Sequence, residues 1–278
     1  MAETSPMTVR GKVTLLAVPS ALVAAGIAGA LLALPKLVPA GPASPPAVTD
    51  GRQVYEQNCS CCHGPRGEGN GPAAVSPRAR YFGFDKYRFA TTPNGVPTDD
   101  DLARLIRNGI PGSAMPKFDT LTDEQVLALI RLVRDLTRAG VYERWAREAR
   151  KEDPDDPDLA GVVKKIDADV TVLSSVALTN LPRAANLANG KRIFDTSCAQ
   201  CHGSLGKGDG PQEQRTDDGT LIRPRDLTSG TYKGGARLED LHARILLGVP
   251  GTPMPATNTL APQDMADLIG YVRSLVGR

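Results

Sequence analysis

The chain has 278 residues, 33 of them basic and 31 acidic, and carries a formal net charge of +2. That length leaves room for about two ordinary domains, and a hydrophobic content of 41% is enough for packed cores. Because no block of one charge stands out, the composition argues against a nucleic-acid-binding protein, and five cysteines in so long a chain argue against a disulfide-stapled scaffold.

The N-terminal region predicts a membrane anchor. Residues 1–12 are polar and end in Arg10 and Lys12, whereas residues 13–34 contain no charged side chain. At about 1.5 Å per residue the uncharged segment would span roughly 33 Å, close to the ~30 Å hydrocarbon core of a bilayer. We therefore expect a cytoplasmic tail at 1–12 and a transmembrane helix at 13–34. The alternative is a cleaved signal peptide, although its apolar region is usually only about 7–15 residues long.

A proline- and alanine-rich spacer at residues 35–48 leads into a segment whose most informative feature is a five-residue motif. The residues from Cys59 to His63 read C-x-x-C-H, the attachment site of a c-type haem. In such a site the sulfurs of Cys59 and Cys62 bond covalently to the haem, and His63 reaches the iron. A gap of two residues suits this role because it places both sulfurs on one helical turn.

Two helices are predicted after the motif. Thr98 or Asp99 can cap a short helix that stops at Gly109. Thr122 then starts a longer helix with apolar residues at helical spacing, and Gly140 can end it.

The stretch 141–186 differs in character from this first unit, which comprises residues 49–140. It begins as a charged helix that Pro154 and Pro157 interrupt. We interpret it as an interdomain connector with a little structure of its own. Trp145, the single tryptophan of the chain, is expected to anchor the connector to a neighbouring surface.

Residues 187–278 form a second unit that repeats the first. Gly190 matches Gly51 at a shift of 139 residues (190 − 51), and the match runs without a gap. An internal duplication is the simplest explanation, and with two copies it makes two domains rather than a solenoid. The second C-x-x-C-H motif consists of Cys198, Cys201 and His202 with the two residues between the cysteines.

Each unit has one methionine at the same distance from its motif histidine. Met115 follows His63, and Met254 follows His202, by 52 residues (115 − 63 and 254 − 202). Both methionines lie in similar loops rich in glycine and proline. A thioether in such a loop is suited to be a sixth, axial iron ligand, and His/Met ligation raises the reduction potential of a haem.

Other uses of these cysteines explain less of the pattern. Two C-x-x-C pairs can bind one zinc ion, and one pair can form a thiol–disulfide couple. Neither explains a histidine after both pairs or a methionine at equal distance from both. Cys61 has no counterpart, because Gln200 occupies its place, and we expect a spare thiol beside the haem. His242 aligns with Ala103, and we expect a surface or helix-facing histidine.

With these residues the sequence resembles a tandem pair of class I cytochrome c domains. The resemblance implies an all-α fold of two cytochrome c-like haem domains, preceded by one N-terminal transmembrane helix, and two covalently attached c-type haems. It also implies that the first and last helices of each domain cross. The crossing residues would be Gly51, Tyr55, Leu129 and Leu132 in the first domain and Gly190, Phe194, Leu268 and Tyr271 in the second. A proline carbonyl would accept the N–H of the ligating histidine, with Pro72 and Pro211 as candidates.

The resemblance and the ligand set together predict a membrane-anchored dihaem electron carrier rather than an enzyme. An iron whose two axial positions are filled by the protein leaves no place for a substrate. The implied donor is a quinol-oxidising complex and the implied acceptor a terminal oxidase, with the haem domains on the periplasmic side of a bacterial cytoplasmic membrane. Two alternatives keep the haem domains. One is a permanent subunit of an oxidase or dehydrogenase complex, and the other, which fits two matched methionines less well, is a dihaem peroxidase-type enzyme.

Overall fold

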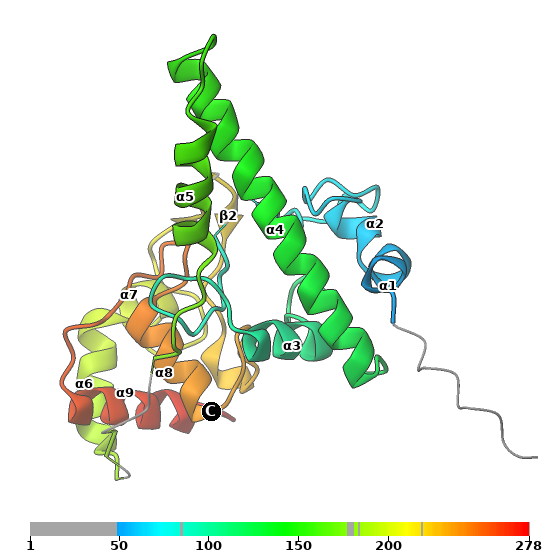
Figure 1. The fold of residues 1–278 in the computed structure, drawn as a ribbon. Helices are drawn as coiled ribbons and strands as arrows, with labels where there is room; N and C mark the ends of the chain where they lie inside the picture. Colours follow the sequence, from blue (N-terminus) through cyan, green and yellow to red (C-terminus); the bar gives the residue numbers. More distant parts are fainter. Residues whose placement is uncertain (1–48, 84–85, 177–180, 183, 218, 278) are drawn as a thin grey trace, which may run out of the picture. The chain divides into compact units, whose positions relative to one another are not determined.

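A computed structural model describes residues 49–83, 86–176, 181–182, 184–217 and 219–277 of the chain (Figure 1). The expected cytoplasmic tail, transmembrane helix and spacer, together residues 1–48, lie outside the described residues. Within the described ranges, no helix has both the length and the hydropathy needed to cross a bilayer. The described part is mostly helical, as the sequence predicted.

The first repeat contains helices α1 (Gly51–Asn58), α2 (Ser60–His63), α3 (Asp99–Asn108) and α4 (Asp123–Glu152). Thr98 caps α3: its hydroxyl accepts the N–H of Asp101 at 3.0 Å, while the Asp101 carboxylate accepts the N–H of Thr98. Thr122 caps α4 in the same way, with Gln125 as its partner. These helix starts are therefore confirmed, as is the end of α3 before Gly109.

Helices α1 and α4 cross where Gly51 provides no side chain. A Cβ at Gly51 would lie only 2.4 Å from the carbonyl oxygen of Ala128. Tyr55 and Leu129, each 1% exposed, pack into one cluster at this crossing, and Leu132 packs against its edge. The predicted helix contact of the first domain is confirmed.

The second repeat contains helices α6 (Leu187–Ser197), α7 (Ala199–His202), α8 (Leu238–Leu247) and α9 (Pro262–Ser274). Figure 1 shows α6 and α9 crossing, and a Cβ at Gly190 would lie 2.1 Å from the carbonyl oxygen of Asp267. The rings of Phe194 and Tyr271 are 5.4 Å apart, with Leu268 in the same buried cluster. The predicted helix contact of the second domain is confirmed as well.

The second repeat also holds a small strand pair that the all-α prediction did not include. Strands β1 (Gln214–Arg215) and β2 (Leu221–Ile222) pair antiparallel, with Gln214 opposite Ile222. A 3-10 turn, η1 (Leu227–Ser229), follows. These elements lie in the loop between the second motif and α8.

Helix α4 passes through Gly140, where the sequence suggested a helix end, and continues to Glu152. Gly140 serves a close contact instead: a Cβ there would lie 2.6 Å from the Cα of Gly83. The helix stops before Asp153 because Pro154 follows, and a proline disfavours helical conformation in the residue that precedes it.

The connector contains helix α5 (Leu159–Val170), which folds back along α4 (Figure 1). A small buried cluster joins these two helices, formed by Val141, Val162 and Ile166. Trp145 packs against this cluster and donates from Nε1 to Asp169 Oδ2 at 2.7 Å. Trp145 therefore joins α5 to the end of α4, a contact within the connector itself and not the expected one with a neighbouring surface.

Hydrogen bonds join the two repeats. Arg104 of α3 donates from Nη1 to Oδ1 of Asp240 in α8 at 2.9 Å, and it also pairs with Asp101 of its own helix. Arg244 of α8 donates to the backbone carbonyl of Arg88, in the chain segment ahead of α3. Helix α8 therefore contacts the first repeat at two points.

Candidate functional site

Both C-x-x-C-H motifs form a single helical turn. In the first repeat α1 ends before Cys59, and Cys62 and His63 donate their backbone N–H groups to the Cys59 carbonyl at 3.1 and 2.9 Å. In the second repeat the equivalent distances to the Cys198 carbonyl are 3.2 and 2.9 Å. The two cysteines of each motif therefore lie on one turn, with the histidine next to them.

A glycine-rich loop folds back on each motif. Gly69 donates its N–H to the carbonyl of His63 at 2.8 Å, and the equivalent bond in the second repeat is also 2.8 Å. A Cβ at Gly71 would lie 2.3 Å from the carbonyl oxygen of Cys61. The loop can approach the motif this closely only because glycine has no side chain.

Each motif histidine is oriented by a backbone carbonyl. Nδ1 of His63 lies 3.2 Å from the carbonyl oxygen of Arg80, and Nδ1 of His202 lies 3.2 Å from that of Arg225. Donation from Nδ1 to this carbonyl leaves Nε2 as the nitrogen whose lone pair can ligate iron.

The prediction that the carbonyls of Pro72 and Pro211 accept the histidine N–H groups is therefore wrong. The carbonyls of Arg80 and Arg225 take that place. Gly71 donates its N–H to the Cys62 carbonyl at 3.1 Å, so the chain next to Pro72 is still bonded to the motif itself and reaches the imidazole only further on. The two acceptors are 145 residues apart (225 − 80), six more than the repeat shift of 139. The β1–β2 hairpin occupies this longer loop of the second repeat, so the gap-free match of the sequences does not hold there.

Burial shifts the pKa values of the motif histidines and cysteines. It lowers the pKa of His63 and of His202, against the opposing effect of the bonded carbonyl, and so favours the neutral imidazole that binds a metal. Burial, together with a smaller effect of the neighbouring cysteines, raises the pKa of Cys59 and of Cys198 to about 11. These thiols are therefore uncharged at neutral pH, which suits an apolar site.

The two methionines lie in loops that close in the same way. Ile110 donates its N–H to the carbonyl of Met115, and Val249 to that of Met254, both at 3.1 Å. The N–H of each methionine is bonded to the hydroxyl of the residue two positions earlier, at 3.2 and 3.3 Å. Repeat-equivalent loops thus place the two methionines at equivalent positions in their domains.

In the first repeat the motif and the methionine line one cavity, which Cys59, Cys62, His63 and Met115 all border. The ring of Phe82 stacks on that of His63 with 4.8 Å between centroids. Much of the remaining wall is apolar and includes Tyr55, Phe82, Leu102, Ile106, Phe118 and Leu129. Two thiols, an imidazole and a thioether around an apolar cavity fit a covalently attached haem, a large flat group with two axial positions.

Two further side chains have no repeat counterpart. Cys61 is exposed, and its Sγ lies 3.8 Å from Sγ of Cys62. His242 of α8 is only 7% exposed, and burial lowers its pKa, so it is a histidine on a packed helix rather than a surface one. No group of three or more His, Cys, Asp or Glu side chains in the described part of the chain is arranged to hold a metal ion.

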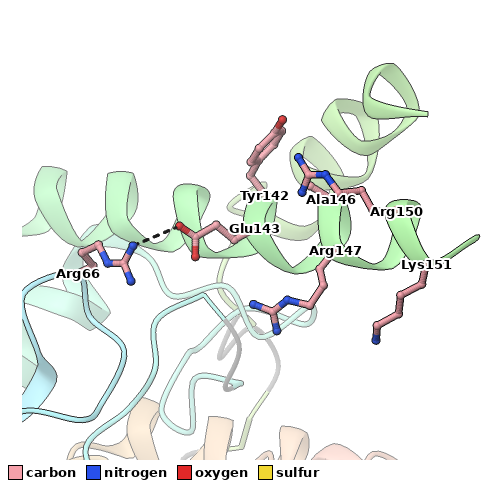
Figure 2. Close-up of a pocket in the computed structure, with 7 residues that line it drawn as sticks. All are labelled: Arg66, Tyr142, Glu143, Ala146, Arg147, Arg150 and Lys151. Atoms are coloured by element: carbon pink, nitrogen blue, oxygen red, sulfur yellow. Dashed lines mark ion pairs between the residues drawn. The ribbon is translucent and has the colours of Figure 1, made fainter. Parts of the chain in front are cut away.

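A second hollow lies alongside the C-terminal half of α4 and is mostly basic (Figure 2). Figure 2 shows Arg66 directed toward Glu143, with 3.8 Å between Nη1 and Oε1. The other lining residues are Tyr142, Ala146, Arg147, Arg150 and Lys151. None is a cysteine, histidine or methionine, so this hollow offers no haem ligand.

Known families match both repeats. The family described as "Cytochrome c" matches residues 187–276, and the family described as "Cytochrome C oxidase, cbb3-type, subunit III" matches residues 46–133. Each match includes one C-x-x-C-H motif and the methionine that follows it.

The chain is also similar to individual proteins. The chain is 23% identical over 260 residues to the cytochrome bc1 complex cytochrome c subunit of Mycobacterium leprae (strain TN), a match that covers 91% of this chain and 70% of the relative. It is 33% identical over 95 residues to cytochrome c of Gossypium barbadense, covering 30% of this chain and 85% of the relative. A solved chain of the Kuenenia stuttgartiensis reducing HAO-like protein complex is similar at a TM-score of 0.64 and 33% identity, over 84% of this chain and 98% of that one.

Proposed function

Since this chain belongs to the cytochrome c family, as a tandem of two class I domains, we propose that it is a dihaem electron carrier anchored to a bacterial cytoplasmic membrane. The observation that carries the proposal is the repetition of the whole site. The motif turn, the carbonyl-oriented histidine and the closed methionine loop each occur once per repeat. A chain with two such sites can pass single electrons from a donor to an acceptor.

The proposed axial ligands are His63 with Met115 in the first domain and His202 with Met254 in the second. The haem, when bound, supplies a one-electron Fe(III)/Fe(II) couple. The residues of the chain hold it, keep water from most of it and thereby set its reduction potential. The proposed covalent attachment points are Cys59, Cys62, Cys198 and Cys201.

For the free carrier, we propose a quinol-oxidising complex as donor and a terminal oxidase as acceptor, both met at the periplasmic face of the membrane. The uncharged segment 13–34 supports this location, because an N-terminal anchor would confine the carrier to the membrane plane. Recovery of the full chain in washed membranes, with its haem domains open to protease added from the periplasmic side, is the expected result. A haem protein recovered only in the cytosol would contradict the location.

A second candidate is a permanent haem subunit of an oxidase or dehydrogenase complex. It is favoured by the names of two similar proteins, one a subunit of a cytochrome bc1 complex and the other a chain of a HAO-like complex. Co-purification with a fixed partner after mild solubilisation would select this candidate. Purification as a single chain that still accepts and donates electrons would select the free carrier.

The central test is a potentiometric titration of the purified protein, followed by visible absorbance, with carbon monoxide added at the reduced end. Two high-potential steps without a spectral response to carbon monoxide are expected, because both axial positions of each iron would be filled by the protein. One low-potential haem that binds carbon monoxide would instead indicate an open site, as a peroxidase-type enzyme requires.

A further inference from the structure

A lysine of the second repeat lines the cavity of the first. Lys233 is half-buried and borders the cavity together with Arg88 and Met115 of the first repeat. Burial, and then the positive charges of Arg225 and Arg88, lower the pKa of Lys233. No ion pair to a described carboxylate involves this lysine. A cation in this position is unfavourable until an anion joins it.

Packing between the repeats brings Lys233 to this place. A Cβ at the adjacent Gly234 would lie 2.9 Å from the Phe89 ring, so the backbone of the second repeat rests directly on a residue of the first. Arg244 of α8 also contacts the segment that carries Phe89: its guanidinium lies 5.8 Å from the centre of the Phe89 ring and donates to the carbonyl of Arg88. The lysine is therefore placed by a built contact between the repeats and not by a loose surface loop.

We propose that Lys233 is a positioning residue of the second domain for the cofactor of the first, its ammonium group binding a carboxylate of the haem held by Cys59 and Cys62. The inference rests on the proposed function, since it needs a haem at that site. A haem is apolar except for its two carboxylates, and a carboxylate in a largely apolar cavity is stabilised by a charge-assisted hydrogen bond to a cation. The first haem site would then be complete only when the second domain is docked against it.

The charge of Lys233 should favour the reduced form of the first haem, because reduction adds an electron close to a cation. Replacing the lysine in the full-length holoprotein, as Lys233→Gln, should lower one of the two midpoint potentials and leave the other unchanged. We expect about a tenfold fall in the equilibrium constant for that reduction step, which corresponds to 59 mV for one electron. Lys233→Arg should keep the wild-type potential, because it keeps the charge.

Lys117→Gln is the matched control. Lys117 follows Met115 by two residues but is exposed, and its Nζ is paired with Asp119 at 2.7 Å, so its loss removes the same charge from outside the cavity. Met115→Ala should itself change the midpoint potential of the first haem. When Lys233→Gln is added to that variant, the same midpoint potential should shift further, which assigns the effect to the first haem.

Equal shifts in Lys233→Gln and Lys117→Gln, or a shift in Lys233→Arg as large as that in Lys233→Gln, would overturn the proposal. Either result would leave a protein with two titrating haems, and hence the proposed function, intact. A wild-type protein without haem at Cys59 and Cys62 would refute the proposed function and the inference together.

Discussion

Arg104 of α3 donates a hydrogen bond to Asp240 of α8, which holds in the second repeat the position that Asp101 holds in the first (240 − 101 = 139). Asp101 and Asp240 are 1% and 3% exposed, and each accepts the backbone N–H of the residue that precedes its helix, Thr98 at 3.0 Å and Arg237 at 3.2 Å. One guanidinium therefore joins two equivalent buried carboxylates across the repeats. The residue equivalent to Arg104 is Ala243, so the second repeat has no arginine at this position that could bond to Asp101 in the same way.

Replacing Arg104 with methionine should loosen the contact between the domains. The substitution leaves two buried carboxylates with less compensation, and we expect a loss of about 3 kcal/mol in the free energy of unfolding. Urea denaturation followed by circular dichroism measures it. Arg131→Met, at an exposed position of α4, is the control and should change the stability by less than about 0.5 kcal/mol. Equal effects of the two variants would show that the Arg104 contact contributes nothing.

Loss of either axial methionine should open one iron to an external ligand. In Met115→Ala and in Met254→Ala we expect one of the two reduced haems to bind carbon monoxide and its midpoint potential to fall, because the thioether ligand favours Fe(II). Visible spectra of the reduced proteins with and without carbon monoxide provide the measurement. Met265→Ala, in a buried position on α9, is the control and should leave both haems closed. If neither Met115→Ala nor Met254→Ala binds carbon monoxide, the ligand assignment is wrong.

Asp267 of α9 should make the second domain sensitive to acid. It is 2% exposed and accepts hydrogen bonds from the Asn186 N–H and from the amides of Asn189 and Gln263. Burial by itself would raise the pKa of Asp267, but these hydrogen bonds outweigh burial and hold the pKa below its usual 3.8. A lowered pKa in the folded state means that this stabilisation is complete above about pH 4 and is lost as the pH falls through the folded pKa.

Asp267→Asn is therefore expected to cost about 2 kcal/mol of unfolding free energy at pH 7, with a smaller difference from wild type below pH 4. Urea titrations at several pH values test this. Asp195→Asn removes an exposed partner of Lys191 and should cost less than about 1 kcal/mol. A difference between Asp267→Asn and wild type that stays constant down to pH 3 would contradict the role given to the ionised carboxylate.

Gly140→Ala separates two explanations of a glycine within α4. If helix propensity alone mattered, alanine would stabilise the helix by about 1 kcal/mol. Because a Cβ would lie 2.6 Å from the Cα of Gly83, we expect the opposite sign, a destabilisation of about 2 kcal/mol, measured by thermal or urea unfolding. Asp135→Ala, exposed on the same helix, has only the propensity gain and should be neutral or stabilising. A stabilised Gly140→Ala protein would mean that the Gly83 contact relaxes without cost.

The elements that the sequence predicted correctly depend on neighbours along the chain or on the repeat. The starts of α3 and α4 follow from Thr98 and Thr122, whose hydroxyls bond backbone groups only three residues away. The helix crossings were implied by the resemblance to class I cytochrome c domains, and the duplication assigned the matching residues in the other repeat. The motif cysteines fall on one turn because a two-residue gap allows little else.

The sequence alone thus determined the helices of each repeat, and it predicted the residues of each candidate site. The tertiary structure decided which carbonyls orient the histidines, why Gly140 is a glycine, and that Lys233 of one repeat borders the cavity of the other. The physical reason is the distance along the chain over which each interaction acts. Capping and helical spacing act over one or two turns, whereas the Arg80 carbonyl lies 17 residues from His63, and Arg104 meets Asp240 across 136 residues. Such contacts depend on how loops of different length fold back, and no local pattern in the chain encodes their path.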